Sequence, residues 1–498
     1  MSTIVYGGSL AAMVAVDQLA AAGEQVTFVT PSPRLGGRLG GARLGDARFD
    51  TGLVIFENGA LNGGGYPDPT SYDPDVCNDC SRFGMLLARY TESLGLVLER
   101  IPRLELWSHG RLIPDFIFDT RLDGVRALPD WLQAQATAEL TARLASGEHP
   151  LHARRKHVEP RYGSLSYETA SIANHGAVLH TACFDPFARK VTGRSSADAL
   201  ALHSRDVRLP LFWPEALHDA FRGCDALLPD TPFHVVRGGA VSDLVAALAV
   251  RLRESSLVRR LVGSARAVHS DGAGIRLDVD GTPIRGRHLI WGHDLDDLAR
   301  LTSAAPVAPV ERASMAIVLA LVARADIANA ELGTVIIPED HALPYRITNQ
   351  SRNAGVPDES LARISVEWGG ADAPDSDDAL LALSQSALAR IGVTKQDAGF
   401  VAHRILRIPG ALVLPNAANR DAMLHMRQQV DASGLRILTV APAAGFAVAS
   451  LNDQLVQGMR AARLALGAMT QDATIDGTTP NGATSQADGA AYSTQVAA

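Results

Sequence analysis

Near the N-terminus, apolar residues first run together and then recur at helical spacing. Residues 4–6 form a short apolar run that reaches a pair of glycines, and residues 10–22 carry apolar side chains at helical intervals. Gly23 ends that segment, and a second apolar run follows at residues 26–29. The order strand, tight turn, helix and strand predicts a βαβ unit. Such a unit directs the unpaired N–H groups of a helix N-terminus at its turn, where a phosphate can bind.

The turn of this unit carries an incomplete dinucleotide fingerprint. The usual motif has three glycine positions, the last of which accepts alanine, and an acidic residue about 20 positions later that binds a ribose hydroxyl. Here the three positions hold Gly7, Ser9 and Ala12, and Gly8 lies between the first two. The acidic position holds Thr30, which can hydrogen-bond but carries no charge. A βαβ unit that binds no nucleotide is the alternative interpretation of this stretch alone.

A glycine-rich loop with two cationic ends follows the second predicted strand. It reads RLGGR and comprises Arg34, Gly36, Gly37 and Arg38 around one leucine. Flexible backbone between two guanidinium groups suits a pyrophosphate or a flavin edge, although a plain surface turn would look the same. Residues 42–52 then alternate as a hairpin strand does and end in FDTG.

The order of these three elements resembles the flavoprotein superfamily of amine oxidases, phytoene desaturases, protoporphyrinogen oxidases and UDP-galactopyranose mutases. The resemblance extends to about residue 468 and implies an α/β fold, with a discontinuous Rossmann-like FAD-binding domain and a mixed α+β substrate domain. It implies an FAD-binding domain from residues 1–60, 231–300 and 430–468, and a substrate domain from residues 61–230 and 301–429. Residues 469–498 are polar and small, and we expect a disordered tail there.

The resemblance also implies cofactor contacts far from the N-terminus. Backbone near Ala265 occupies the place where these proteins read the adenine edge. Asn452 lies at the start of a predicted helix that points toward the flavin pyrimidine in relatives. The strand before it ends in Ala441 and Pro442 instead of the usual Gly-Arg or Gly-Asp, and the proline removes a backbone donor.

Three side chains are the candidates for substrate contact. Lys190 matches the lysine of a mutase-like segment, but the aromatic residue that usually precedes the nearby glycine is Thr192 here. Lys190, with Arg194, suits an anionic group on the substrate, although two cations at a solvated helix end are the plainer alternative. Tyr345 and Arg346 match a pair that lies over the substrate side of the flavin, or else are outward polar residues of a strand. No side chain is identified as a catalytic base.

Composition and charge restrict the function classes further. The chain has 498 residues, too long for one core, and its formal net charge of −8 argues against binding nucleic acid. Its four cysteines do not form a disulfide framework, and the pair Cys77 and Cys80 lacks a second pair at metal spacing, so we predict no metal. No stretch is apolar enough to span a bilayer and the N-terminus lacks the features of a signal peptide, so we expect a cytoplasmic protein.

Three functions are compatible with these observations. The first is an FAD-dependent oxidoreductase that acts on a small metabolite, and the second is a mutase-like, flavin-dependent isomerase. The third is a non-catalytic protein that keeps the fold and has lost FAD, because Ser9, Thr30 and Ala441-Pro442 all depart from the usual cofactor contacts. A small-molecule substrate is the expected partner, and a homodimer is the one assembly considered.

Overall fold

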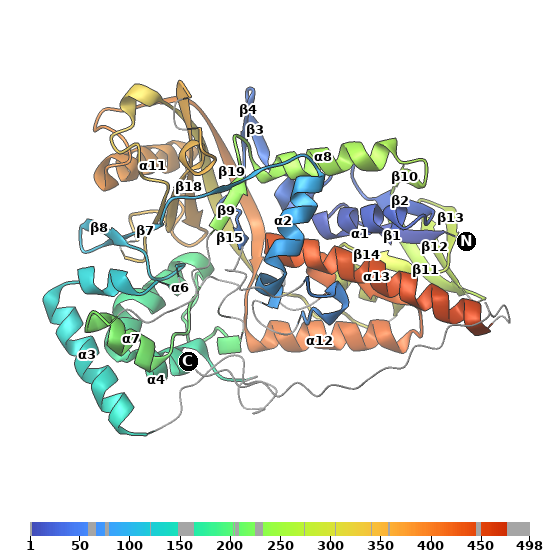
Figure 1. The fold of residues 1–498 in the computed structure, drawn as a ribbon, viewed down its shortest axis with the longest axis horizontal. Helices are drawn as coiled ribbons and strands as arrows, with labels where there is room; N and C mark the ends of the chain where they lie inside the picture. Colours follow the sequence, from blue (N-terminus) through green and yellow to red (C-terminus); the bar gives the residue numbers. More distant parts are fainter. Residues whose placement is uncertain are drawn as a thin grey trace.

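Two lobes lie side by side in the computed structural model (Figure 1). No helix in the part of the chain that the structure describes has the length and apolar character needed to cross a membrane. The structure describes the whole chain except residues 1, 58–65, 75–78, 120, 148–163, 203, 205–208, 225–232, 273, 304, 340, 357–358, 445–449 and 476–498.

One lobe contains a five-stranded parallel sheet assembled from four distant parts of the chain. Its three central strands are buried throughout and mostly apolar, which is typical of a parallel sheet covered on both faces, whereas the two edge strands are partly exposed. The N-terminal βαβ unit is therefore confirmed. The strand order is β10 (Val258–Val262), β2 (Val26–Thr30), β1 (Thr3–Tyr6), β14 (Leu289–Trp291) and β20 (Ile437–Thr439).

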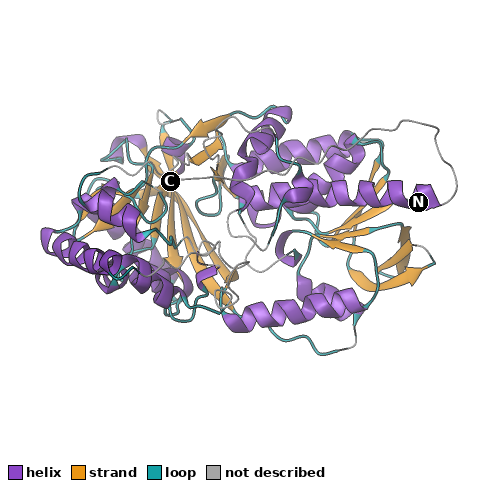
Figure 2. Cartoon of the chain, turned by 60° about the horizontal axis from the view of Figure 1, so that its bottom comes forward, coloured by secondary structure: helices purple, strands orange, loops and turns teal. Residues whose placement is uncertain are grey.

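Helices cover both faces of this sheet (Figure 2). Helix α1 (Leu10–Ala21) packs against α8 (Val241–Glu254) and α13 (Leu451–Ile475), with α2 (Gly84–Ser93) beside α13. On the other face lie α9 (Leu295–Thr302), α12 (Ala417–Ala432) and an antiparallel sheet of β11 (Ala265–Asp271), β12 (Gly274–Val279) and β13 (Thr282–Gly286).

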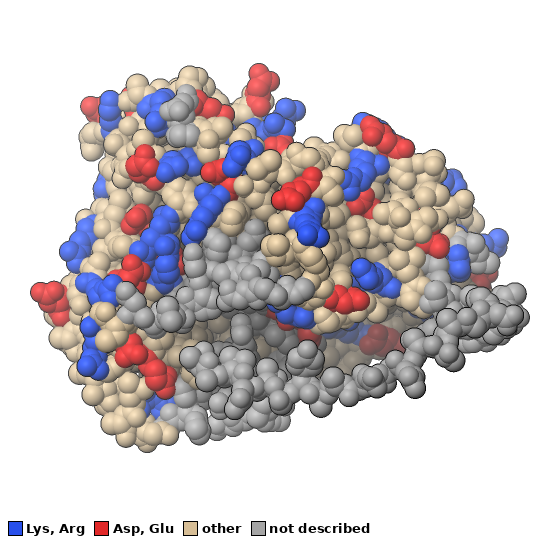
Figure 3. Space-filling model, viewed as in Figure 1, with Lys and Arg blue, Asp and Glu red and all other residues tan. Residues whose placement is uncertain are grey.

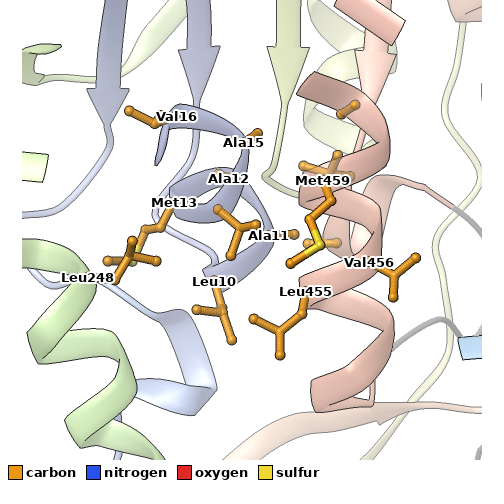
Figure 4. Packing of buried hydrophobic residues seen from close by; sticks show 14 of the residues in the cluster. Leu10, Ala11, Ala12, Met13, Ala15, Val16, Leu248, Leu455, Val456 and Met459 are labelled. Carbon is orange, nitrogen blue, oxygen red and sulfur yellow. The ribbon is translucent and has the colours of Figure 1, made fainter. Parts of the chain in front are cut away.

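Residues 10–16 of helix α1 are apolar on every side, so these two turns can be stable only when they are enclosed. Every residue from Leu10 to Val16 is fully buried. Figure 4 shows Leu248 of α8 on one side of α1, and Leu455, Val456 and Met459 of α13 on the other. The N-terminal unit therefore depends on segments more than 200 and 400 residues further along the chain.

The second lobe contains a seven-stranded mixed sheet whose three longest strands lie together at one edge. Helices α3 to α7 and α11 surround it, and the short α10 follows β17. The strand order is β19 (Phe400–Val413), β15 (Arg312–Ala323), β18 (Leu361–Gly369), β17 (Arg346–Asn349), β16 (Thr334–Ile336), β7 (Glu105–Ser108) and β8 (Arg111–Pro114). The helices are α3 (Asp130–Ala145), α4 (Tyr167–His175), α5 (Ala177–Leu179), α6 (Asp185–Thr192), α7 (Pro214–Phe221), α10 (Gln350–Asn353) and α11 (Asp377–Ile391).

Two small sheets lie where the lobes meet. One is the hairpin of β3 (Ala42–Leu44) and β4 (Ala47–Phe49), and the other joins β5 (Phe56–Glu57), β9 (Phe233–Val236) and β6 (Leu98–Arg100). The α/β fold class with a second mixed lobe is confirmed. The division into domains at the predicted residue numbers stays a prediction, and helix α13 continues to Ile475, into the segment expected to be a tail.

We predict that the α1–α13 contact tolerates no side chain at Gly458. A Cβ built there would lie 2.5 Å from the carbonyl oxygen of Ala11 and 2.7 Å from the Cβ of Val14. Gly458→Ala should therefore lower the free energy of unfolding by about 1–3 kcal/mol.

Gly467 of the same helix is exposed and has open space around it, so it is the matched control. Gly467→Ala should leave stability unchanged or raise it by up to about 1 kcal/mol, because alanine favours helix more than glycine does. Urea unfolding of both variants measures the difference. Equal effects at the two positions would contradict the close packing of α1 on α13.

Candidate functional site

Two neighbouring cavities, which share part of their lining, lie between the lobes. The inner chamber has a volume of about 460 Å³ and the outer chamber about 990 Å³. Both are lined by Ser9, Gly37, Arg38, Thr51, Ile408 and Pro442. The two chambers therefore adjoin along a common wall.

The outer chamber begins at the N-terminus of α1. Gly7 has a φ of +119°, and a Cβ there would lie 2.3 Å from the carbonyl oxygen of Gly292, so only glycine fits between β1 and β14. Gly8 and Ser9 line the chamber. The Ser9 hydroxyl accepts a hydrogen bond from the N–H of Ala12 at 3.3 Å and so caps α1, which gives the serine in the fingerprint a structural reason.

The RLGGR loop lies against the start of α1. The N–H of Gly36 donates to the carbonyl oxygen of Gly8 at 2.7 Å, and Gly36 has a φ of +84°. Arg34 donates from Nη2 to the carbonyl oxygen of Gly41 at 2.6 Å. Arg34, Gly37 and Arg38 line the outer chamber, so the loop and the turn of the βαβ unit lie in one site.

Thr30 and Ala265 are not among the described residues that line either chamber. The Thr30 side chain is fully buried, and its Oγ1 has no hydrogen-bond partner among the described residues. Pro31 and Ser32, the next two residues, line the outer chamber instead. The N–H of Ala265 donates to the Tyr6 hydroxyl at 3.1 Å, which ties β11 to the end of β1.

The end of β20 and the start of α13 close the site from the opposite edge. Ala441 is buried with a φ of +56°, and its N–H donates to Oε1 of Gln457 at 2.6 Å, whereas Pro442 lines both chambers. The Asn452 amide accepts from the N–H of Glu57 at 3.1 Å and donates to its carbonyl oxygen at 2.9 Å. Asn452 therefore fastens β5 to α13 and does not line the chambers.

The structure corrects the prediction that Lys190 contacts substrate. Its side chain is 1% exposed, and Nζ donates to the carbonyl oxygens of Glu339 at 3.0 Å and Pro344 at 3.1 Å. A buried ammonium group requires such acceptors, and they hold it outside the cavity. Arg194 forms an ion pair with Glu311 at the surface, and neither cation lines a chamber.

Tyr345 and Arg346 do line the inner chamber, together with Glu367, which sequence reasoning missed. Antiparallel pairing of β17 and β18 places Arg346 opposite Glu367. Glu367 accepts hydrogen bonds from the Tyr345 hydroxyl at 2.8 Å and from Nε of Arg346 at 2.7 Å. Burial and then the Glu367 charge raise the pKa of Tyr345. Burial alone would lower the pKa of Arg346, but the Glu367 carboxylate raises it.

The N-terminus of α13 presents a second buried carboxylate to the inner chamber. Asp453 and Ser450 form reciprocal hydrogen bonds, with Asp453 N–H to Ser450 Oγ at 3.0 Å and Ser450 N–H to Asp453 Oδ2 at 3.2 Å. The Tyr72 hydroxyl donates to Asp453 at 2.9 Å. Burial raises the pKa of Asp453 and that of the adjacent Cys80 thiol, whose partner in the CxxC, Cys77, lies outside the described residues.

Asp50 of the FDTG segment connects the hairpin to α8. Its carboxylate accepts a 2.8 Å hydrogen bond from the N–H of Val241 at the start of that helix. The Gln350 side-chain amide accepts a hydrogen bond from the N–H of Asp50 and donates one to its carbonyl oxygen, at 3.0 Å each. Gly52, with a φ of +102°, then passes so close to Glu367 that a Cβ would lie 2.7 Å from its Oε2. FDTG therefore shapes the chamber wall.

His293, Asp294 and Asp297 bring potential ligand atoms within 4.8 Å of one another at the end of β14. His293 lies 3.3 Å from Asp297, and Arg312 lies 3.7 Å from Asp294.

The overall fold is that of several solved enzymes. No family model matches this sequence, and no curated protein matches it. The chain superimposes on reduced UDP-galactopyranose mutase with a TM-score of 0.71 at 15% identity over 95% of each chain. It matches cyclohexylamine oxidase from Brevibacterium oxydans IH-35A (TM-score 0.59, 13% identity) and putrescine oxidase bound to putrescine (0.58, 13%), each over 94% of this chain and 99% of the other. The likeness shows a common fold.

We predict strong coupling between Glu367 and Arg346. Glu367→Gln should lower the free energy of unfolding by about 3–5 kcal/mol, because it leaves the buried guanidinium without its counter-charge. Arg346→Met should cost a similar amount, and the double variant should cost clearly less than the sum. Urea unfolding of the three variants measures the coupling energy. Additive effects would show that the two groups do not depend on each other.

We predict that Asp50 makes stability fall as pH rises from about 4 to 7. Burial raises its pKa to about 7, so the folded state binds more protons than the unfolded state in that window. Asp50→Asn keeps an acceptor for Val241 and removes the titration. The stability of the variant relative to the wild type should increase by roughly 2–4 kcal/mol between pH 4 and pH 8. Chemical unfolding at both pH values tests this, and a constant difference would refute it.

Proposed function

We propose that this protein is an FAD-dependent oxidoreductase that acts on a small, largely apolar metabolite. The observation that carries the proposal is the pair of adjoining chambers, which we take as one passage from the N-terminus of α1 to an apolar space between the lobes. One end of the passage suits a dinucleotide phosphate, and the other suits a substrate beside the flavin ring. The solved structures with this fold are named as oxidases and a mutase, which supports an enzyme.

The residues present fit FAD at the phosphate end. Gly8 and Ser9 offer the N-terminus of α1, and Arg34 and Arg38 offer positive charge. Ser32 lines the chamber beside the position of the usual acidic residue, so a hydroxyl rather than a carboxylate would meet the ribose. The N-terminus of α13 opens on the inner chamber at Leu451, where its positive dipole end would favour negative charge on the flavin pyrimidine.

Bound FAD would supply the redox chemistry by accepting a hydride. The chain itself would orient the substrate and exclude water. The inner wall is predominantly apolar, and the lining side chains include Leu53, Ile55, Phe118, Phe187, Met315, Ile317 and Leu412. The Tyr345–Arg346–Glu367 group is the polar anchor in this wall, and its internal hydrogen bonds hold it in one geometry.

The charges of the inner chamber favour oxidation over a mutase-like reaction. A diphosphate substrate needs several unpaired cations. Lys190 and Arg194 are held outside the chamber, and Arg346 is neutralised by Glu367. The chamber lining has five carboxylate residues, Glu57, Asp294, Asp296, Glu367 and Asp453, against the three arginines Arg38, Arg312 and Arg346. This balance favours a neutral or cationic substrate.

A non-catalytic protein that has lost FAD would have no reason to keep this passage open. Side chains that fill a cavity are stabilising, so an unused cavity of this size is a cost to folding. The glycines that keep the loop beside α1 clear of side chains support retention of a ligand. A Cβ on Gly40, for example, would lie 2.7 Å from the carbonyl oxygen of Leu35.

The absorption spectrum of the purified protein tests the proposal. We expect a flavin band at close to one equivalent, either as purified or after addition of FAD. Bleaching of that band by a substrate amine or alcohol under anaerobic conditions, and its return with oxygen or an electron acceptor, would identify a net oxidation. If no FAD binds even when it is added in excess, both enzyme functions fail and the non-catalytic alternative stands.

A further inference from the structure

The outer chamber has a second cationic wall that the N-terminal fingerprint does not include. Its lining contains five arginines and no aspartate or glutamate among the described residues. Arg34 and Arg38 belong to the loop beside α1. Arg43, Arg404 and Arg407 come from β3 and from β19, the edge strand of the other lobe's sheet.

Of these three arginines, Arg43 and Arg404 have no carboxylate partner among the described residues. Arg407 forms an ion pair with Asp377, with Nε 3.0 Å from Oδ1, and so is already neutralised. Arg404 donates from Nη1 to the carbonyl oxygen of Arg43 at 3.1 Å, which is a contact with neutral backbone. Neither Arg404 nor Arg43 takes part in an ion pair within the described chain.

Arg43 and Arg404 both add positive charge to the wall of the outer chamber. The hydrogen bond between them holds the β3–β4 hairpin against β19, and Figure 1 shows these elements next to each other. No aspartate or glutamate among the described residues of the chamber lining balances this charge. On the face drawn in Figure 3, cationic and anionic side chains are interspersed, whereas the described lining of the outer chamber has arginines and no aspartate or glutamate.

We propose that Arg43, on the hairpin between the lobes, and Arg404, on the sheet of the second lobe, bind the pyrophosphate of the cofactor opposite the N-terminus of α1. The inference rests on the proposed function, because it takes the dinucleotide to lie in the outer chamber. Guanidinium groups bind phosphate oxygens with paired, charge-assisted hydrogen bonds. These two arginines would thus supply affinity that the uncharged Thr30 and the donor-free Pro442 do not. The cofactor would then be held between both lobes.

Titration of the whole protein with FAD tests the inference. Arg404→Gln and Arg43→Gln should each raise the dissociation constant for FAD about tenfold, as measured by quenching of flavin fluorescence. Arg404→Lys should recover part of the loss, since it restores the charge without the fork of donors. The affinity of the wild type should fall with added salt, and the two glutamine variants should show a weaker salt dependence.

Arg48→Gln is the matched control. Arg48 lies directly opposite Arg43 in the same hairpin, forms an ion pair with Asp243 and does not line the outer chamber. The Arg48→Gln substitution should leave the affinity for FAD unchanged. Thermal unfolding should show that all variants remain folded. If the wild type binds FAD and Arg404→Gln behaves as Arg48→Gln does, the inference is overturned and the proposed function survives. If the wild type binds no FAD, the proposed function and the inference are overturned together.

Discussion

The enclosure of α1 is the constraint on which the rest of this structure depends. A helix whose first two turns are apolar on all sides cannot lie at a surface, so the sheet covers one side while α8 and α13 cover the others. Those helices come from distant parts of the chain, and their N-termini arrive at the same end of the sheet as that of α1. At each of these three N-termini a backbone N–H donates a hydrogen bond to a polar side chain: Ser9 at α1, Asp50 at α8 and Ser450 at α13.

The same arrangement separates the site into two electrostatic parts. The outer chamber combines the positive end of α1 with arginines from both lobes, and carboxylates are absent from its described lining. In the inner chamber one group of charged side chains, Arg346 and Glu367 with Tyr345, is buried and bonded internally. Arg43 and Arg404, which have no carboxylate partner among the described residues, suit a fixed anionic ligand. An apolar wall in which Arg346 and Glu367 neutralise each other suits a small substrate that binds reversibly.

Several features of the site were missed because the residues are far apart in sequence. Glu367 lies within an apolar strand, and only its register opposite Arg346 brings it to the cavity. Asp453 had a local signal, because serine followed three positions later by an acidic residue marks a helix start, but its burial beside Tyr72 has none. Lys190 was assigned from a local match, and its burial against the carbonyl oxygens of Glu339 and Pro344 depends on a loop about 150 residues away.

The sequence by itself determined the βαβ unit, the position of its turn, the glycine-arginine loop and the α/β class, because these depend on apolar periodicity and on backbone conformations that only glycine adopts readily. Tertiary structure alone decided which polar side chains face the cavity. Burial and pairing depend on the register of strands that lie hundreds of residues apart, and no local pattern encodes that register. For this reason Thr30 and Asn452 lie outside the chambers while Arg43 and Arg404 line one of them.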